Sequence, residues 1–506
     1  MTGRFLKAAF AVAVFAVCAA TSAHAAPEAT VDAGSLAGVD RAGVVQFLGV
    51  PFAAPPLGKQ RWRAPQPVTP WTGIRSAGRM AARCSAPNSG DGPRLVNEDC
   101  LYLNVYAPAG AKPGEKLPVM VYFHGGGNYS GSPNVYDGSR MAVVAHAVVI
   151  IPAYRLGVFG FLAHPALSAE DQANASGGYG LLDQIAALKW INTNAAAFGG
   201  NPADVTVTGE SSGGADVCGL MAAPAAKGLY RRTIVESGVC QFVQPLKAQE
   251  KQGSILAAAL GCRDAACLRA LPAAALIDKV GEMSTAAPFG TALQPEAPMT
   301  AFADGHFTHS PMIIGFTHDE AWSFNHGLYP MSEAQYEATV RRQFGAKAGK
   351  VLDLYPVADY PHIEYALGGL QTDQLFVCPA LKIADSVSRY APVSVYEFAD
   401  RTVPPWKSLG ATPSPIPPGY SPRASHTSEL QYVYAYKGAV GPLNAAQSAL
   451  ADKMVKLWVA FGRKSRAWPA YAAEDRQVLE LRLPEQGGIT PLATVYDDHK
   501  CSYWNG

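Results

Sequence analysis

One stretch of the sequence decides the fold: Asp204-Val205-Thr206-Val207-Thr208-Gly209-Glu210-Ser211-Ser212-Gly213-Gly214. Apolar and polar residues alternate in its first half, which is the period of a β-strand. Gly-x-Ser-x-Gly follows, and small residues then open a predicted helix. A strand that turns directly into a helix holds the middle serine in a tight elbow, where glycines leave room for the two elements. The stretch therefore predicts that the Ser211 hydroxyl and the next N–H face one cleft. Because the chain has 49 glycines, the pentapeptide alone can arise by chance.

The rest of the chain alternates predicted strands with predicted helices. Short, largely apolar runs lie at residues 117–123, 148–151, 205–208, 233–235 and 312–316. Runs of this kind suit a sheet that is buried on both faces. Apolar residues at helical spacing lie at 179–196 and 444–461. The alternation predicts an α/β fold: a mostly parallel, doubly wound sheet with helices on both faces and its site at the carboxyl ends of the strands.

Residues 26–506 are predicted to form one large domain with long loop insertions, because no linker, repeat or change of composition divides them. The stretch 403–422 is rich in Pro, Gly and Ser, and we expect a long surface loop near the site. Residues 1–25 have the pattern of a signal peptide: Arg4 and Lys7, an apolar stretch, then Ala23-His24-Ala25. We expect cleavage after Ala25 and export to the periplasm or the medium.

The composition excludes several classes of partner. The net charge is +1, only 16% of the residues are charged, and no basic block suggests binding to nucleic acid. The apolar part of the N-terminal segment is too short to span a membrane, and no second long apolar run follows it. We expect neither a nucleic-acid partner nor a membrane span.

Nine cysteines are informative in an exported chain, and Cys18 leaves with the signal peptide. We expect three disulfides, Cys84–Cys100, Cys262–Cys267 and Cys378–Cys501. Cys218 and Cys240 remain, and their apolar surroundings in the sequence predict buried free thiols.

A serine nucleophile needs a base, an orienting carboxylate and N–H donors for the oxyanion. His124-Gly125-Gly126-Gly127 directly follows a predicted strand and offers backbone donors. In α/β-hydrolases the catalytic residues follow one another along the chain in the order serine, acid, histidine. Glu320 is the candidate acid because it lies after Ser211 and directly beyond the strand 312–316. The residues alone do not decide which histidine is the base. The candidates are His426, His326 and His362, with a slight preference for His426.

Four sets of motifs carry a resemblance to a known family: Gly49-Val50-Pro51-Phe52-Ala53 with Arg61-Trp62, Asn97-Glu98-Asp99-Cys100-Leu101-Tyr102-Leu103-Asn104-Val105, Tyr154-Arg155-Leu156-Gly157, and Phe198-Gly199-Gly200-Asn201-Pro202. With the serine elbow, they resemble the type-B carboxylesterases, the cholinesterase-like branch of the α/β-hydrolases. The resemblance covers nearly all of the chain after residue 25. It implies an α/β-hydrolase fold and an esterase that acts on small-molecule esters without a metal or cofactor.

The resemblance also implies residue roles. Ser211 matches the nucleophile, Glu320 the triad acid and His426 the base. The oxyanion donors match Gly126, Gly127 and the N–H of Ser212, where the family usually has alanine. The three cysteine pairs match disulfides of the family, and Glu98 with Arg155 matches a buried ion pair.

Two departures bear on the substrate. Cholinesterases carry a tryptophan in the loop after the first cysteine, whereas residues 84–100 contain no aromatic residue. A quaternary ammonium group therefore lacks its main platform. Asn128 stands where an aromatic residue is common, which predicts a more polar acyl side. Candidate walls of the pocket are Phe289, Tyr129 and Trp322.

Two other classes of protein compete with an esterase. Some cholinesterase-like domains have lost the triad and serve as binding modules, but all three triad positions are filled here. A metallohydrolase would need clustered ligands, for which His318-Asp319-Glu320 and Asp497-Asp498-His499 offer suitable residue types. Neither triplet has a recognised ligand spacing, so we expect no catalytic metal.

Overall fold

The computed structural model describes residues 26–87, 94–277, 279, 283–405, 418–421, 423–435, 441–463 and 468–505. The expected signal peptide at 1–25 lies outside these residues. So does most of the expected loop at 403–422, including Trp406.

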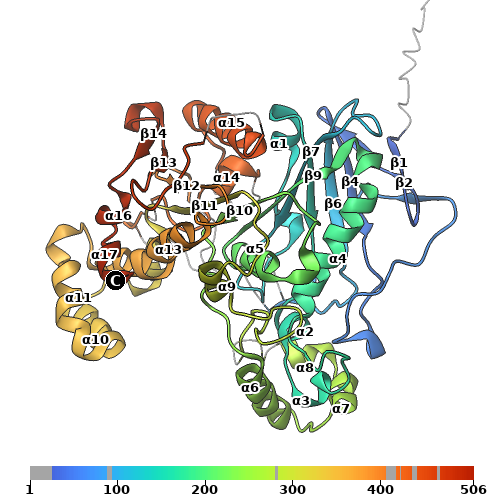
Figure 1. Ribbon diagram of the computed structural model, residues 1–506, viewed down its shortest axis with the longest axis horizontal. Coiled ribbons are helices and arrows are strands. Elements are labelled where there is room, and N and C mark those ends of the chain that lie inside the picture. The colour runs from blue at the N-terminus through green and yellow to red at the C-terminus, as the bar shows by residue number, and fades with distance from the viewer. Residues whose placement is uncertain are drawn as a thin grey trace, which may run out of the picture.

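One sheet of 11 strands runs through the molecule in the order β14-β13-β12-β11-β10-β9-β7-β8-β6-β4-β3 (Figure 1). From β8 through β7 to β13 every neighbouring pair is parallel, and the pairs at the two ends are antiparallel. A second sheet has the order β1-β2-β5. The strands are β1 (Glu28–Val31), β2 (Gly34–Ala37), β3 (Val39–Arg41), β4 (Val44–Pro51), β5 (Ile74–Ser76), β6 (Tyr102–Pro108), β7 (Leu117–Phe123), β8 (Val148–Pro152), β9 (Gly200–Glu210), β10 (Arg232–Glu236), β11 (Met312–Thr317), β12 (Val393–Phe398), β13 (Val478–Leu481) and β14 (Ile489–Leu492).

Helices cover the sheet and extend beyond it. They are α1 (Ser139–Val144), α2 (Gly157–Phe161), α3 (Pro165–Ser168), α4 (Tyr179–Asn194), α5 (Ser212–Ala222), α6 (Leu246–Ala259), α7 (Ala265–Ala270), α8 (Ala273–Ile277), α9 (Pro298–Asp304), α10 (Glu333–Phe344), α11 (Ala348–Leu354), α12 (Ile363–Thr372), α13 (Cys378–Val387), α14 (Leu430–Val433), α15 (Ala445–Ala460), α16 (Val495–Asp498) and α17 (Cys501–Trp504). A 3₁₀-helix, η6 (Glu320–Leu328), follows β11, and a π-helical turn, η9 (Asp373–Val377), joins α12 to α13.

The sheet is buried on both faces, as the apolar strand runs predict. Val119 and Val121 of β7 pack into a core shared with α4, α5 and α13, whereas Met120 and Tyr122 pack with α1, α14 and α15 on the other side. Side chains alternate between the faces of a strand, so a strand covered on both sides, such as β7, carries apolar residues at successive positions. Both predicted helices also form, α4 at the first stretch and α15 at the second, where Asn444 and Gln447 make a capping box.

Four disulfides link the described residues. Three are the expected pairs: Cys84–Cys100, Cys262–Cys267 and Cys378–Cys501. The expectation of free thiols at Cys218 and Cys240 is wrong, because these two residues form the fourth disulfide. Cys218 lies on α5 and Cys240 follows β10, and α5 packs against β10, which brings the two Cα atoms to 5.9 Å. A disulfide content of this kind is typical of oxidising compartments. Among the helices described, none has the length and apolar character that a membrane crossing requires.

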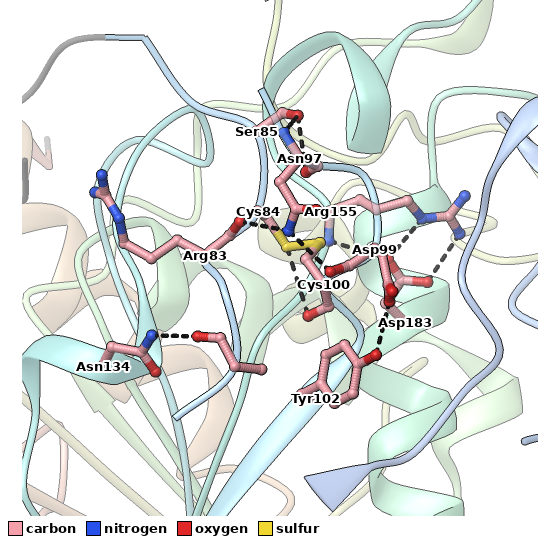
Figure 2. Close-up of a disulfide and its surroundings, with 11 residues drawn as sticks. Arg83, Cys84, Ser85, Asn97, Asp99, Cys100, Tyr102, Asn134, Arg155 and Asp183 are labelled. Atoms are coloured by element: carbon pink, nitrogen blue, oxygen red, sulfur yellow. Dashed lines mark hydrogen bonds and ion pairs between the residues drawn. A yellow bond between two sulfur atoms is a disulfide. The ribbon is translucent and has the colours of Figure 1, made fainter. Parts of the chain in front are cut away.

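The expected ion pair between Glu98 and Arg155 is also wrong. Arg155 pairs with Asp183 of α4 through two contacts of 2.7 and 2.8 Å, beside the disulfide Cys84–Cys100 (Figure 2). Glu98 instead accepts two hydrogen bonds from Arg61, at 2.5 and 2.7 Å. Each guanidinium thus meets one carboxylate in the bidentate geometry that satisfies a buried pair best. The exchange follows from α4, which supplies a carboxylate directly opposite Arg155.

Candidate active site

Ser211 lies between β9 and α5 with φ 57° and ψ −122°, a conformation that residues other than glycine rarely adopt. The two glycines of the motif permit this turn. A Cβ on Gly209 would lie 2.4 Å from the carbonyl oxygen of Gly213. A Cβ on Gly213 would lie 2.1 Å from the carbonyl oxygen of Phe123. Strand and helix therefore approach each other closely only because both side chains are missing.

The structure brings the three expected triad residues together. His426 Nε2 lies 2.9 Å from Ser211 Oγ, and His426 Nδ1 lies 2.6 Å from Glu320 Oε2. The backbone N–H of His426 also donates to the carbonyl of Glu320, at 2.9 Å. The two other candidate bases are elsewhere. His326 Nδ1 contacts the carbonyl of Ser323, and the ring of His362 packs against Tyr329 and Tyr365.

Glu320 is held from several sides. Its Oε1 accepts hydrogen bonds from Ser237 Oγ at 2.6 Å and from the N–H of Thr317 at 2.8 Å, which leaves Oε2 for the imidazole. Sequence reasoning did not identify Ser237. Its position directly after β10, at the carboxyl end of a central strand, was the available signal.

Asp319 connects the acid turn to the histidine loop. Its Oδ2 accepts from the N–H of Ala424 at 3.3 Å and from Arg401 Nε at 3.1 Å. Ala424 lies two residues before His426. Asp319 therefore holds one end of the segment 424–426, and Glu320 holds the other end at His426. Sequence reasoning treated Asp319 only as one member of a possible ligand triplet.

The glycine-rich loop follows β7 and takes conformations that favour glycine, with φ 107° at Gly126 and 63° at Gly127. Within the described residues, the N–H groups of Gly126 and Gly127 donate no hydrogen bond to the protein. Ser212 is the first residue of α5, so its N–H has no intrahelical partner. The loop is anchored to the elbow, because the N–H of Asn128 donates to Ser212 Oγ at 3.0 Å.

Comparison with known proteins identifies the chain. The model of the carboxylesterase family matches residues 25–504. This chain belongs to the carboxylesterase family. It is 34% identical over 491 residues to the para-nitrobenzyl esterase of Bacillus subtilis (strain 168), covering 89% of this chain and 94% of that protein. It is 32% identical over 509 residues to the cocaine esterase of Homo sapiens, covering 92% and 87% of the two chains.

The structural comparison agrees. The structure of a thermophilic PNB esterase aligns with a TM-score of 0.76 at 32% identity, covering 92% of this chain and 97% of that chain. The chain is therefore a carboxylic ester hydrolase with the α/β-hydrolase fold, and the predicted fold class is confirmed.

Two phenylalanines line the imidazole of this carboxylesterase. Phe324 of η6 and Phe376 of η9 place their ring centroids 5.2 and 5.0 Å from that of His426. Phe324 is 49% exposed, so an apolar surface is open beside the imidazole of His426. Neither residue was identified from the sequence, because both lie on irregular helical turns without a motif.

The expected pocket walls have different outcomes. Trp322 stacks on Tyr365 at 4.1 Å, carries Arg423 over its ring and is 6% exposed, so it belongs to the core. Tyr129 borders the glycine loop, since a Cβ on Gly127 would lie 2.5 Å from its ring. Phe289 is half-buried and is fixed through its backbone to the segment that begins α6.

The expected polar acyl wall at Asn128 is wrong. Asn128 is buried, its Nδ2 donates to Asp216 Oδ1 at 2.9 Å, and its Oδ1 accepts from the Tyr154 hydroxyl at 2.9 Å. A positive φ of 57° turns this residue away from the path of an extended chain. Its amide therefore joins a buried network behind the glycine-rich loop.

Carboxyl groups lie buried behind the elbow. Glu210 Oε1 is 3.3 Å from His426 Nε2. Burial raises the pKa of Glu210 well above its usual value, and the nearby Glu429, Glu320 and Glu236 raise this pKa further. Burial and the same kind of carboxylate neighbours raise the pKa of Glu429. Glu210 was part of the motif in the sequence, yet only the fold shows that it contacts the imidazole.

Glu236 makes stability depend on pH. Burial raises the pKa of its carboxyl to about 7, although the hydrogen bond from Thr208 and the nearby indole N–H of Trp458 oppose the rise. The folded state therefore holds this proton more tightly than the unfolded state, whose carboxyl has a pKa of about 4.3. Its contribution to stability is complete below that unfolded pKa and is lost as the pH rises through about 7.

We expect Glu236→Gln to remove about 2–3 kcal/mol of the decline in unfolding free energy between pH 5 and pH 8. Urea unfolding of both proteins at the two pH values measures this difference. Asp216, whose pKa burial also raises to about 7, is present in both proteins and cancels from the comparison. Equal declines in the two proteins would contradict the assignment.

Proposed function

We propose that this carboxylesterase hydrolyses small-molecule esters through an acyl-enzyme on Ser211. His426 takes the proton from Ser211 Oγ as the hydroxyl attacks the ester carbonyl, and then gives it to the leaving alcohol. Glu320 orients the imidazole through Nδ1 and stabilises the positive charge that develops on it. One observation carries the proposal: the unbroken hydrogen-bond line Ser211–His426–Glu320, with distances of 2.9 and 2.6 Å.

The tetrahedral intermediate needs donors for its oxyanion. The N–H groups of Gly126, Gly127 and Ser212 are proposed for this role, because none of them donates a hydrogen bond within a helix or strand and all three adjoin the elbow. A water molecule then attacks the acyl-enzyme, and His426 repeats its role as base. The chemistry is complete without a metal or an organic cofactor.

The proposal is tested with the full chain and an alkyl fluorophosphonate, which phosphonylates an activated serine. Peptide mass spectrometry should find one label per chain, on the peptide that contains Ser211, with loss of activity in step with labelling. Unfolded protein serves as the control and should take no label. A label on another residue, or full labelling with full activity, would overturn the assignment. A panel of aryl and alkyl esters with graded acyl length then defines the substrate.

We expect no preference for cationic esters. Residues 84–100 contain no aromatic residue, and the face of Trp322 is covered by Tyr365 and Arg423. A cation stacked in a dry aromatic site gains about 2 kcal/mol or more, which is roughly thirtyfold in binding. The kcat/KM for acetylcholine should therefore not exceed that for its neutral carbon isostere. A clear preference for the cation that Tyr129→Ala or Phe324→Ala abolishes would show that another loop provides the platform.

The proposed enzyme is an exported protein. Residues 1–25 act as the signal peptide and residues 26–506 form the mature hydrolase, in the periplasm or outside the cell. The four disulfides support this placement, because they persist in oxidising compartments. The proposed partner is a small ester, and the near-neutral charge gives no basis for binding nucleic acid.

A further inference from the structure

Two histidines and a glutamate meet at the edge of the molecule where β11 and β12 end. His318 follows β11, Glu397 lies on β12, and His499 lies between α16 and α17. The Glu397 Oε1 atom is 2.6 Å from His318 Nδ1 and 2.9 Å from His499 Nε2. One ligand atom from each of the three residues lies within 4.8 Å of the others. The two triplets that the sequence offered as possible metal ligands thus each contribute one histidine to the same place.

A fourth residue fixes the orientation of the buried histidine. Asp373 Oδ1 lies 2.5 Å from His499 Nδ1, so that the other ring nitrogen faces Glu397. Histidines that bind metals almost always donate their second N–H to a carboxylate or carbonyl, which sets the tautomer and the direction of the ring. His499, Asp373 and Glu397 are all buried, so this part of the cluster is rigid.

The cluster is open on one side. The side chain of His318 is 30% exposed and lines a cavity of about 250 Å³, together with Arg401, Glu480 and Arg482. Glu480 pairs with Glu397 across the strands β13 and β12, so that both carboxylates lie on the same face of the sheet. The cavity gives an ion a path to the cluster and leaves space for a water molecule as a further ligand.

We propose that His318, Glu397 and His499 bind one divalent ion of the zinc class. Two imidazoles and one carboxylate with an open fourth position are a ligand set that Zn²⁺ uses in proteins. In the present structure one ring nitrogen of each histidine, Nδ1 of His318 and Nε2 of His499, donates an N–H···O hydrogen bond to Glu397. The ion takes the place of the hydrogen in both bonds. His499 releases its Nε2 proton to solvent and keeps the Nδ1 proton that it donates to Asp373, while His318 binds through Nδ1 as the neutral imidazole with its proton on Nε2.

Geometry allows this exchange with a small movement. Tetrahedral ligands at about 2.0–2.1 Å from zinc are roughly 3.3 Å apart, so His318 and Glu397 must separate by several tenths of an ångström. His318 is the partly exposed member and can move into the cavity. The bound ion holds His499, two residues before Cys501, against Glu397 of β12. It also holds His318, which lies two residues before Glu320.

The test is a titration of the disulfide-intact, chelator-treated full chain with Co²⁺, which absorbs visible light when its ligands are tetrahedral. We expect one equivalent of Co²⁺ to produce absorption bands in the visible range, and Zn²⁺ to abolish them by displacing the Co²⁺. His318→Ala should weaken binding at least tenfold. Asp373→Asn should weaken it about 10–100-fold, because the orienting carboxylate is lost. Circular dichroism confirms that each variant is folded.

His306→Ala is the matched control, because His306 is an exposed histidine in the other grouping of possible ligands, with Glu296 and Asp304. This variant should bind Co²⁺ like the unchanged chain. A second readout is the melting temperature, which should rise with Zn²⁺ in the unchanged chain and in His306→Ala, but not in His318→Ala. Absence of the cobalt bands, or their loss in His306→Ala rather than in His318→Ala, would overturn the proposal.

Discussion

Replacing Ser211 by alanine is expected to lower kcat by about 10⁶ and to leave the protein folded, by analogy with serine protease triads. The hydroxyl oxygen is the only atom removed, and it is the atom that His426 Nε2 contacts at 2.9 Å. Alanine keeps a Cβ, so the strained φ of 57° costs as much before as after the change. The measurement is the hydrolysis rate of a p-nitrophenyl ester under saturation, together with fluorophosphonate labelling.

Ser212→Ala provides the matched control, because the two serines are adjacent. Its hydroxyl accepts the N–H of Asn128 at 3.0 Å, and losing this bond should cost stability on the order of 1 kcal/mol. Its backbone N–H, the group proposed as oxyanion donor, is retained. Activity should therefore stay within about tenfold of the unchanged enzyme. If Ser212→Ala lost most of its activity while Ser211→Ala kept it, the nucleophile would be Ser212 and the assignment to Ser211 would be wrong.

Much of the fold could be predicted because the sheet is covered on both faces. The strands β7, β8 and β11 are apolar along almost their whole length, and their apolar runs are visible in the sequence without knowledge of the neighbouring strands. The elbow was predictable from its glycines: Gly209 leaves room for Gly213 within one strand–turn–helix unit, and Gly213 leaves room for the neighbouring strand β7 at Phe123. The order Ser, acid, His located Glu320 at the end of β11, whereas the residues alone left three histidines for the base.

The errors concern partners that lie far apart in the sequence. Cys218 meets Cys240 because α5 packs against β10, and Arg155 meets Asp183 because α4 packs against α2, which begins two residues after Arg155. Asn128 directly follows the glycine triplet 125–127, and nothing in that position of the sequence indicates where its side chain goes. In the structure its φ is positive and its amide contacts Asp216. No local pattern specifies which of several charged or polar residues will be opposite once the helices pack. The same limit hid Ser237 and Asp319, which hold the acid and the histidine loop.

Replacing His426 by alanine should cost about as much as replacing Ser211, on the order of 10⁶ in kcat, because the serine then has no base. Glu320→Gln should cost less, on the order of 10⁴, since the imidazole remains but its tautomer and its developing charge lose support. Ser237 Oγ and the N–H of Thr317 still contact the residue at 320, so the turn should keep its shape. Rates with one p-nitrophenyl ester under saturation give both values.

His326→Ala and His362→Ala are the controls, because the residues alone left these histidines open as the base. His326 contacts the carbonyl of Ser323 and His362 packs between Tyr329 and Tyr365, so neither substitution removes an atom that contacts Ser211. We expect both variants to keep the kcat of the unchanged enzyme within a few-fold per folded molecule, although burial of His326 predicts some loss of stability. If either variant lost activity by several orders of magnitude while His426→Ala kept most of it, the hydrogen-bond line from Ser211 to Glu320 would not be the path of the proton.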